Sequence, residues 1–257
     1  MLVGVIHLPA LPGSPGSTLS AKQCAASAAR CAKALAEYDA IIVENFGDAP
    51  FFAGRVQPVT VAAMTACALA VRETAPGPKL GINVLRNDGE AALSIAACTD
   101  AAFVRVNILT GARVTDQGVI QGDAAGLARL RQTLGVKLDI WADVDVKHSA
   151  PLGPPRPLAQ EVEDTTKRAL ASAVLVTGEG TGKGVDVAKL ANVKAAAGAV
   201  PVYVASGATL ASLETLAGHA DGVIVGSALR PGGKAGIPVD AKLAGEFADA
   251  FRRTFGR

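Results

Sequence analysis

The sequence predicts an α/β fold, a closed (β/α)8 barrel of the TIM type, and two observations carry this prediction. Short strand-like apolar runs alternate strictly with Ala- and Leu-rich stretches of helical character, which is typical of parallel βαβ units. Eight such units fit into 257 residues, the usual size of one such barrel. A doubly wound open sheet is the alternative. We expect a single barrel domain over residues 1–257.

The expected elements follow one another without a composition shift that would mark a domain boundary. The strands are expected at Leu2–Leu8, Ala40–Phe46, Lys79–Leu85, Phe103–Asn107, Lys137–Val146, Val174–Gly178, Val200–Ser206 and Gly222–Ala228. The helices are expected near residues 20–37, 58–75, 88–98, 123–134, 158–172, 186–197, 209–217 and 240–255.

The fifth strand has the most unusual sequence, LDIWADVDVKHSAPL from Leu138 to Leu152. With the period of two of a strand, one face is apolar and the other carries Asp143, Asp145 and Lys147. A strand buried on both faces usually reads as an unbroken apolar run. Charges at such a place need partners or a chemical purpose. A solvated edge strand is the alternative interpretation.

Two connections are longer than the rest, Ile108–Gly122 after the fourth strand and His148–Pro157 after the fifth. Long loops in compact domains are more often functional than idle. Both leave the carboxyl ends of strands, which is the face where barrels of this kind carry their active sites.

Polar or ionisable residues stand at the carboxyl ends of the first six strands, which meet at one mouth in a barrel. Charged side chains buried at this mouth would not stabilise a hydrophobic core, so they indicate a functional role. The candidate catalytic residues are His7, Glu44, Arg105, Asp143 and Lys147, and the candidate substrate-binding residues among them are Asn83, Asn107, His148 and Thr177.

The residue types suggest roles at this mouth. Asp143 and Glu44 are assigned as base and acid, or as ligands of a divalent ion such as Mg²⁺. Lys147 is assigned as an electrophile, or less favourably as a Schiff-base amine. Arg105 and the two asparagines would orient hydroxyl or carbonyl oxygens of a substrate.

The last two strands end differently, in small residues. Ser206-Gly207 opens the seventh helix, and Gly226-Ser227 follows the eighth strand. Small residues let the backbone approach a ligand, and the loops after the last two strands are the usual phosphate site of barrels. A phosphate is therefore expected there. The glycine-rich loop 178–184 lacks the P-loop pattern and is either a plain rim loop or a third anion-contacting loop.

Composition narrows the functional class. The net charge is +2 with 4% aromatic residues, and no basic stripe is visible, so nucleic acid is not an expected partner. No cofactor is assigned with certainty, and three histidines without an H-x-x-x-H pair disfavour structural zinc.

The sequence also indicates where the protein works. The first strand begins at Leu2, which leaves no room for a signal peptide, and no apolar run is long enough for a transmembrane segment. Four cysteines without a C-x-x-C pair fit free buried thiols. We expect a cytoplasmic protein, and a homo-oligomer is compatible with the sequence.

Seven blocks in order resemble the BtpA/SgcQ family of predicted barrel enzymes. They are VIHLPALPGSPGS, AIIVENFGDAPF, LGINVLRND, FVRVN followed by TDQG, ADVDVKHSAPL, VTGEGTG and DGVIVGS. The similarity runs from Val3 to about Asp240. The family's motif positions largely coincide with the candidate residues above and add Thr181 as a substrate-binding position. They also include Asn45, Asp48, Arg86, Asn87, Asp88, Asp116, Gln117 and Gly182. The chain departs from the family at GSALRPGG after the eighth strand and at the Lys-Gly that follows Gly182.

Two functions of different class follow. The favoured one is an enzyme acting on a small phosphorylated metabolite, a sugar phosphate or nucleotide-derived sugar, by isomerase, aldolase or lyase chemistry. The alternative is a non-catalytic assembly factor for a membrane complex such as photosystem I, because the resemblance implies a link to its accumulation in cyanobacteria and a peripheral membrane location. An assembly factor would bind its partner through an apolar patch or a basic face on its outer surface, whereas the unusual residues here are expected inside the barrel mouth.

Overall fold

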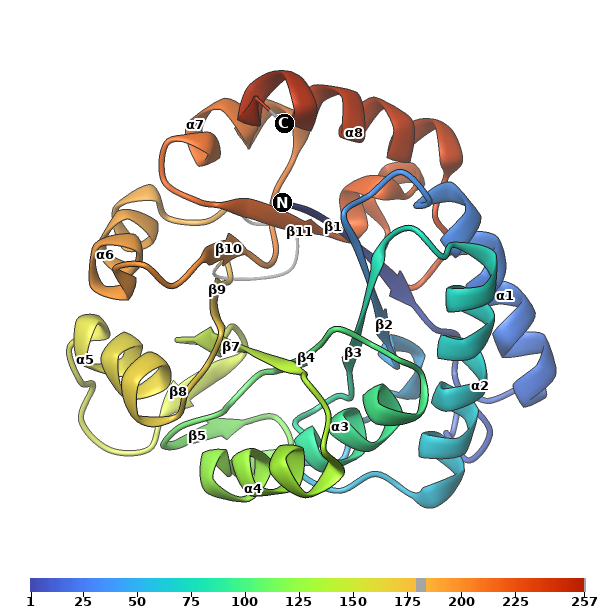
Figure 1. The fold of residues 1–257 in the computed structure, drawn as a ribbon, viewed down its shortest axis with the longest axis horizontal. Coiled ribbons are helices and arrows are strands. Elements are labelled where there is room, and N and C mark those ends of the chain that lie inside the picture. The colour runs from blue at the N-terminus through green and yellow to red at the C-terminus, as the bar shows by residue number, and fades with distance from the viewer. Residues whose placement is uncertain (179–183, 257) are drawn as a thin grey trace.

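The computed structural model describes residues 1–178 and 184–256. Within these residues, eight parallel strands close into a barrel in the order β1, β11, β10, β9, β7, β4, β3, β2, with the helices around it (Figure 1). The strands are β1 (Leu2–His7), β2 (Ala40–Glu44), β3 (Lys79–Asn83), β4 (Phe103–Val106), β7 (Asp139–Val144), β9 (Ala173–Val176), β10 (Val202–Val204) and β11 (Gly222–Val225). Each overlaps the run expected from the sequence, so the predicted (β/α)8 barrel is confirmed.

One helix follows each barrel strand in the described chain. The helices are α1 (Ala21–Ala34), α2 (Pro58–Thr74), α3 (Gly89–Cys98), α4 (Ala124–Leu134), α5 (Leu158–Glu163), α6 (Val187–Ala197), α7 (Leu213–Ala217) and α8 (Ala241–Phe255). Short polar residues start most of them: the side chains of Ser20, Asp123 and Asp240 each accept backbone N–H groups of the first turn, which satisfies donors that the helix leaves unpaired.

The strand alternation separates the core into an inner and an outer part. In β7, Ile140 and Ala142 pack outward in the main cluster shared with the helices, whereas Trp141 lies inside the barrel. Inside, the Trp141 ring stacks on Phe103 with ring centroids 3.6 Å apart and contacts Tyr203 at 5.0 Å. These large rings fill the barrel, so a polar layer can form only above them.

Four neighbouring strands bring one polar residue each to the same level above the rings. The register pairs His7 with Glu44, Glu44 with Asn83, and Asn83 with Arg105 across β1, β2, β3 and β4. Residues paired across parallel strands lie side by side on one face of the sheet. The barrel register therefore creates a polar rim at the carboxyl end.

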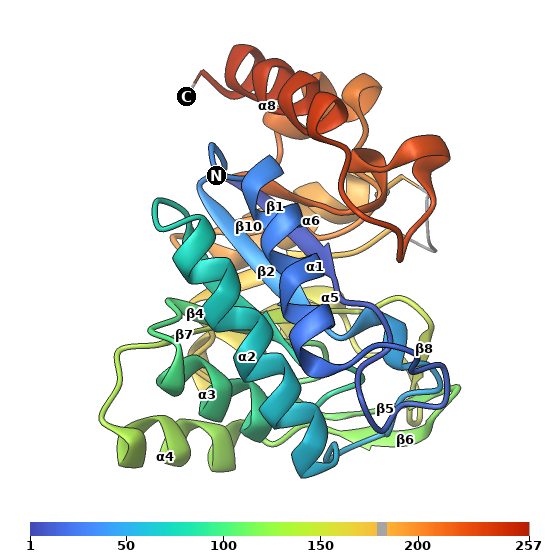
Figure 2. The same ribbon diagram turned by 90° about the vertical axis from the view of Figure 1, so that its right-hand side faces the viewer.

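The two long loops form a small antiparallel sheet that the sequence did not reveal. Strands β5 (Ala112–Thr115) and β6 (Gly118–Gln121) come from the loop after β4, and β8 (Ser149–Pro151) comes from the loop after β7. Their order is β6-β5-β8, and Figure 2 shows them together beside the barrel.

The fifth barrel strand ends two residues earlier than predicted, at Val144. Asp145 has a positive φ of 44°, so it leaves the strand and does not continue the inward face. Its carboxylate binds Arg113 of β5 at 2.6 Å and Lys189 of α6 at 2.6 Å. These ion pairs hold the small sheet and α6 to the end of β7.

Two expectations about the environment can be compared with the fold. Among the described residues, no helix combines the length and apolarity needed to cross a membrane. All four cysteines are free thiols, and Cys24, Cys31 and Cys67 are buried as expected, whereas Cys98 is exposed at the end of α3.

Gly81 in β3 gives a test of the inner packing. A Cβ at Gly81 would lie 2.3 Å from ring atoms of Phe103, so Gly81→Ala should lower the free energy of unfolding by about 1–3 kcal/mol through overpacking. The matched control is Gly245→Ala on the exposed side of α8, where the new Cβ meets no atom of the described chain within 4 Å. There the free energy should rise by about 0.5–1 kcal/mol. Urea melts that show equal effects at both sites would contradict the packing described.

Candidate functional site

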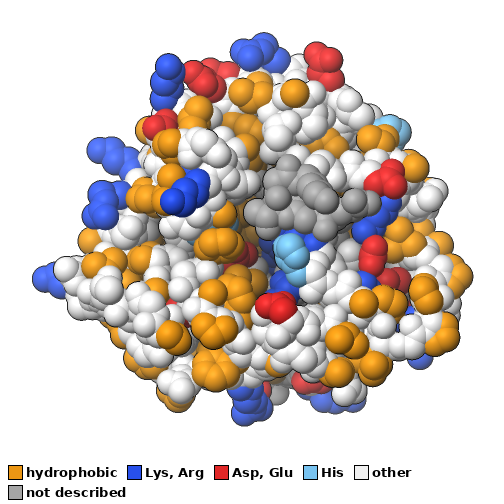
Figure 3. All heavy atoms as spheres, turned by 180° about the vertical axis from the view of Figure 1, so that it is seen from behind, with side chains coloured by type: hydrophobic (Ala, Val, Ile, Leu, Met, Phe, Trp, Pro, Cys, Tyr) orange, Lys and Arg blue, Asp and Glu red, His pale blue; other side chains and the backbone are white. Residues whose placement is uncertain are grey.

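A cavity of about 260 Å³ opens at the carboxyl ends of the barrel strands. The predicted site residues that line it are His7, Glu44, Arg105, Asn107, Lys147, His148, Ser206, Gly207, Gly226 and Ser227. Figure 3 shows the face turned away from the viewer in Figure 1, where a histidine and several Lys and Arg side chains lie together near the centre. The structure thus brings together most of the residues that the sequence singled out.

The remaining predicted residues lie beneath the cavity or outside the described chain. Asn83, Asp143 and Thr177 are 1%, 5% and 2% exposed and are absent from the cavity wall. Thr181 lies outside the described residues. Buried polar side chains of this kind hold other groups in place.

Asp143 is the centre of the buried layer. Both of its carboxylate oxygens accept from the Arg105 guanidinium, at 3.0 Å from Nε and 3.0 Å from Nη2. Asn107 Nδ2 donates to the same carboxylate at 2.7 Å. We expected Asp143 to act as an acid or base, but its position under the cavity and its occupied oxygens assign it to fixing Arg105.

Asn83 supports the same network from β3. Its Nδ2 donates to the Arg105 carbonyl at 3.0 Å and contacts Asn107 Oδ1 at 3.5 Å. Its Oδ1 is one of the buried polar atoms without a hydrogen-bond partner in the described chain. Leaving such an acceptor without a donor is costly, so this oxygen suits a donor brought by water or by a ligand.

Glu44 is buried at the floor of the cavity. Burial raises the pKa of Glu44, against the opposing effects of the Arg105 and Lys147 cations. A buried carboxyl in a cavity, within 4.0 Å of the His7 and Arg105 side chains, is a candidate to exchange a proton with a ligand. Glu44 is therefore the residue best placed for proton transfer.

Glu44 and Asp143 do not form an open pair of carboxylates for a divalent ion. Arg105 lies against both, 4.0 Å from Glu44 Oε2 and 3.0 Å from Asp143 Oδ2, and its positive charge competes for the oxygens that a cation would need. In the part of the chain that the structure describes, no group of three or more His, Cys, Asp and Glu side chains could hold a metal ion. The two carboxylates therefore share the Arg105 side chain in the place where a divalent ion would bind.

His7 is held in its neutral form. Burial first, and then the charges of Arg230, Lys147 and Arg105, lower the pKa of His7 to about 3. An imidazole with that pKa carries no charge at neutral pH and has one donor and one acceptor nitrogen.

The contacts of the His7 ring fix which nitrogen carries the proton. Nδ1 accepts from the Gly236 N–H at 3.1 Å, so the ring proton lies on Nε2, which is 3.8 Å from Glu44 Oε1. Phe46 stacks on the imidazole with ring centroids 4.3 Å apart. His7 therefore presents a fixed N–H donor in the cavity wall, beside Glu44.

Lys147 and Arg86 add positive charge to the same wall. Burial, followed by repulsion from Arg105, lowers the pKa of Lys147. The Lys147 backbone is fixed on both sides, because its N–H donates to Thr177 Oγ1 at 3.0 Å and its carbonyl accepts from Arg86 Nη2 at 2.9 Å. Thr177 thus acts on Lys147 rather than lining the cavity.

The other side of the cavity is built from small residues after β10 and β11. Ser206 Oγ accepts from the Gly178 N–H at 3.2 Å, which leaves its own proton available to a ligand. Gly207 has a positive φ of 81°. A Cβ at Gly226 would lie 3.2 Å from His7 Nε2, so the missing side chain makes room for the imidazole.

Sequence reasoning missed one residue that organises this site. Arg230 is 1% exposed, and its guanidinium donates to the carbonyls of Ile237, Gly226 and Val5. It thereby holds the loop that carries Gly236 against His7. Nothing in the sequence distinguished this arginine from a loop cation. Arg86, in contrast, lies three residues after the end of β3, and the family resemblance singled it out as a motif position without a role.

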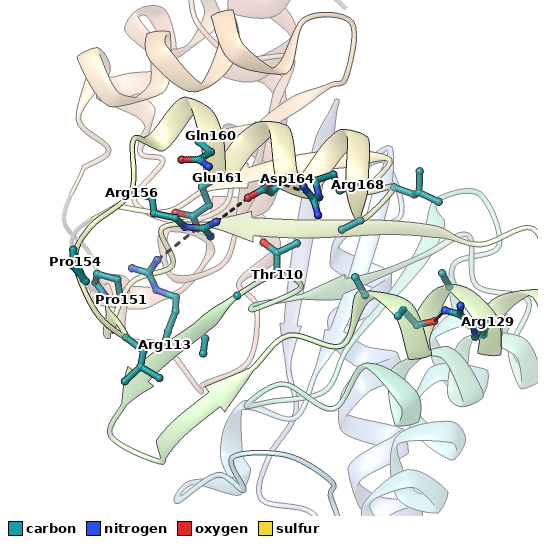
Figure 4. Close-up of a pocket in the computed structure, with 18 residues that line it drawn as sticks. Thr110, Arg113, Arg129, Pro151, Pro154, Arg156, Gln160, Glu161, Asp164 and Arg168 are labelled. Carbon is teal, nitrogen blue, oxygen red and sulfur yellow. Dashed lines mark hydrogen bonds and ion pairs between the residues drawn. The ribbon is translucent and has the colours of Figure 1, made fainter.

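A larger cavity, about 830 Å³, lies outside the barrel between α4, α5 and the small sheet (Figure 4). Most charged residues that line it are already paired, Arg156 with Asp164 at 2.8 Å and Arg113 with Glu161 at 3.6 Å. None of the predicted site residues lines it. The cavity at the barrel mouth is therefore the candidate site.

Comparisons with known proteins agree with this architecture. The sequence model of the BtpA family matches residues 1–253. A Synechocystis sp. protein named Photosystem I biogenesis protein BtpA is 42% identical over 251 residues, which cover 97% of this chain and 87% of that protein.

Solved structures of the same fold include two enzymes. N-(5'-phosphoribosyl)anthranilate isomerase from Pyrococcus furiosus has a TM-score of 0.59 at 16% identity, covering 98% of this chain and 99% of that chain. 3-keto-L-gulonate-6-phosphate decarboxylase from Vibrio cholerae has a TM-score of 0.58 at 13% identity, covering 99% and 98%. At these identities the likeness shows the fold alone, a TIM barrel.

The neutral state of His7 predicts a pH dependence of stability. Native His7 takes up a proton only near pH 3, whereas the ordinary value is 6.5, so the unfolded state binds more protons between these values. The free energy of unfolding should be unaffected by His7 above pH 6.5 and should fall as the pH drops towards 3, by up to about 1.4 kcal/mol per pH unit. Urea melts of His7→Gln should lack this part of the slope. Parallel pH profiles for wild type and variant would contradict the assignment.

The buried network predicts opposite effects for two charged residues. Asp143→Asn leaves the Arg105 guanidinium buried without its counter-charge, so it should lower the free energy of unfolding by about 3–5 kcal/mol. Lys147→Met removes a partly desolvated cation near Arg105, so its melting temperature should equal or exceed that of wild type. Calorimetric melts of both variants, at equal ionic strength, measure the difference. Equal destabilisation would show that Lys147 is also a structural partner.

Proposed function

This chain belongs to the BtpA family, and we propose that it is a barrel enzyme acting on a small phosphorylated metabolite, a sugar phosphate or nucleotide-derived sugar. One observation carries the proposal. A single cavity joins proton-transfer and cationic groups, Glu44 and Lys147 among them, to the small-residue loops after β10 and β11. The first set suits chemistry on a carbonyl compound, and the second suits a phosphate.

The groups at the reactive end fit chemistry that passes through an enolate. Glu44 removes a proton from the carbon next to a substrate carbonyl, and the electron pair moves onto the carbonyl oxygen. The Lys147 ammonium and the Nε2–H of neutral His7 stabilise the oxyanion. If the deprotonated carbon bears a hydroxyl, the hydroxyl proton moves to the former carbonyl oxygen and the abstracted proton returns to the former carbonyl carbon, which is an isomerisation. Breaking a carbon–carbon bond to reach the same enolate is instead an aldolase or lyase reaction.

Arg105 contributes by position rather than by proton transfer. Asp143 and Asn107 hold it in the cavity floor, where a guanidinium that cannot lose its proton orients substrate oxygens. His148 lies at the rim, exposed, with a φ of 57°, and completes the wall on the Lys147 side. In this proposal Lys147 acts as a cation, and a Schiff base to Lys147 is the less favoured route.

The phosphate would bind at Ser206-Gly207 and Gly226-Ser227. Small side chains there allow the backbone to approach an anion, and the Ser206 hydroxyl has a proton to donate. The loops after the last two strands are the common phosphate site of this fold. The two solved barrels named above carry names that specify phosphorylated compounds, which agrees with the proposal, although that likeness concerns the fold alone.

A second candidate function rests on the name of one relative. The Synechocystis protein, 42% identical, is named a photosystem I biogenesis protein, so a non-catalytic role in assembling a membrane complex is the rival proposal. A binding role of that kind would not need a buried carboxyl of raised pKa at the floor of a cavity. A metabolic activity that supports biogenesis is compatible with both the relative's name and this cavity.

We predict a phosphate-dependent ligand. Native mass spectrometry of the purified protein should reveal a bound phosphorylated compound. Titration calorimetry should show that ribose 5-phosphate binds more tightly than ribose by about tenfold or more, because charge-assisted hydrogen bonds contribute that much. Ser227→Asp should abolish the difference, since a carboxylate repels the phosphate.

Matched variants provide a control for the phosphate site and a test against the assembly-factor function. Ser172→Asp adds the same charge at the amino end of β9 and should leave the preference unchanged. Equal affinity of the wild-type protein for the phosphorylated and unphosphorylated sugars would contradict the proposed phosphate site. Glu44→Gln should retain the co-purifying compound but lose its conversion. An assembly factor would instead support photosystem I accumulation in the Synechocystis host equally well with Glu44→Gln.

A further inference from the structure

Arg86 and Lys147 form a cationic pair in the cavity wall without a carboxylate partner of their own. Both line the cavity, and Arg86 is 8% exposed. Across residues 1–178 and 184–256, no Asp or Glu oxygen lies within the 4.0 Å of an ion pair from either side chain. Buried cations without such a partner are costly, so this pair suits an anion that arrives from outside.

The nearby carboxylates are already committed. Asp143 has both oxygens occupied by Arg105 and Asn107. Glu44 approaches Arg105 and His7, and burial raises its pKa. Asp116 also acts on Arg86 at longer range, and one of its carboxylate oxygens accepts from Gln117. Ion pairing in the mouth is therefore directed at Arg105, and Arg86 and Lys147 have no such contact among the described residues.

The two cations are held in place by backbone contacts rather than by each other's side chains. Arg86 Nη2 donates to the Lys147 carbonyl at 2.9 Å, which leaves Nε and Nη1 of the guanidinium for a ligand. The Lys147 N–H is fixed by Thr177, and the described chain shows no hydrogen bond from its ammonium. A planar guanidinium beside an ammonium matches a carboxylate or phosphate group.

The strand order sets Arg86 apart from the Ser206-Gly207 loop, whereas Lys147 follows β7 and lies between them, since only β9 separates β7 from β10. Arg86 follows β3 and Ser206-Gly207 follows β10. In the closed barrel, β4, β7 and β9 separate these strands on one side, and β2, β1 and β11 separate them on the other. The two positions are thus diametrically opposite, yet they line one cavity.

We propose that the substrate carries a second anionic group, a carboxylate or a second phosphate, which is bound by Arg86, opposite the Ser206-Gly207 loop, together with the neighbouring Lys147. This inference rests on the proposed function, because the phosphate at Ser206-Gly207 and Gly226-Ser227 supplies the first anchor. The reacting carbons then lie between the two anchors, over Glu44 and His7. The substrate class becomes a phosphorylated sugar acid or a sugar bisphosphate.

The test separates the two anchors with ligands of one chain length. Titration calorimetry compares glucitol, glucitol 6-phosphate, gluconate and 6-phosphogluconate, with glucitol 1,6-bisphosphate to distinguish a second phosphate from a carboxylate. At least one doubly anionic ligand should bind about tenfold more tightly than glucitol 6-phosphate, the contribution of one charge-assisted pair. Arg86→Gln should remove this gain and leave the affinity for glucitol 6-phosphate unchanged within about threefold.

Two further variants keep the result interpretable. Lys147→Gln repeats the test if Arg86→Gln fails to fold, since the described chain shows no hydrogen bond from the Lys147 side chain. Arg253→Gln, exposed on α8, makes the same change of net charge away from the cavity and should keep the wild-type ranking.

Each pattern of binding has one meaning. Equal affinity of glucitol 6-phosphate and both doubly anionic ligands overturns the second anchor and leaves the phosphate site standing. Equal affinity of gluconate and 6-phosphogluconate, with a gain over glucitol, overturns the phosphate site and leaves the second anchor standing. Persistence of the full gain in both Arg86→Gln and Lys147→Gln overturns the assignment to these residues. No heat with any of the five ligands overturns both.

Discussion

The burial of Arg105 beside Asp143 constrains every other group at the barrel mouth. A guanidinium inside a barrel needs a counter-charge. Asp143 of the neighbouring strand β7 supplies it by accepting from Arg105 with both oxygens, and Asn107 in turn donates to that carboxylate. The pair lies directly above the packed rings of Phe103 and Trp141. It places a permanent cation beside Glu44, it repels Lys147, and it adds to the burial and the other charges that keep His7 neutral.

The sequence predicted the fold because one physical pattern repeats along it. Each apolar run is short, most helices begin with a capping residue such as Ser20 or Asp240, and the alternation of strands and helices leaves few architectures. What the pattern lacked was information on where a strand stops. Asp145 continues the charged alternation in sequence, but its partners Arg113 and Lys189 lie far along the chain, and they turn it out of β7.

The sequence could predict which side chains point into the barrel, but not how deeply each lies below the cavity. A period of two places His7, Glu44, Arg105 and Asp143 on the inner face, and the structure has them there. It does not tell which of them opens to the cavity, because that depends on how each strand is staggered against the next. Asp143 is consequently a support for Arg105. Arg230 escaped notice for a related reason, since its acceptors are backbone carbonyls brought together only by the closed barrel.

The sheet of β5, β6 and β8 joins the two long loops into one structural unit. β5 belongs to the loop after β4 and β8 to the loop after β7, and they pair from Arg113 with Pro151 to Thr115 with Ser149. A loop-grafting experiment that exchanges only one of them would therefore leave the other with an unpaired strand edge, prone to misassembly. An exchange of these loops between relatives of this protein should therefore include both of them, together with Asp145, which precedes β8 and forms an ion pair with Arg113 of β5.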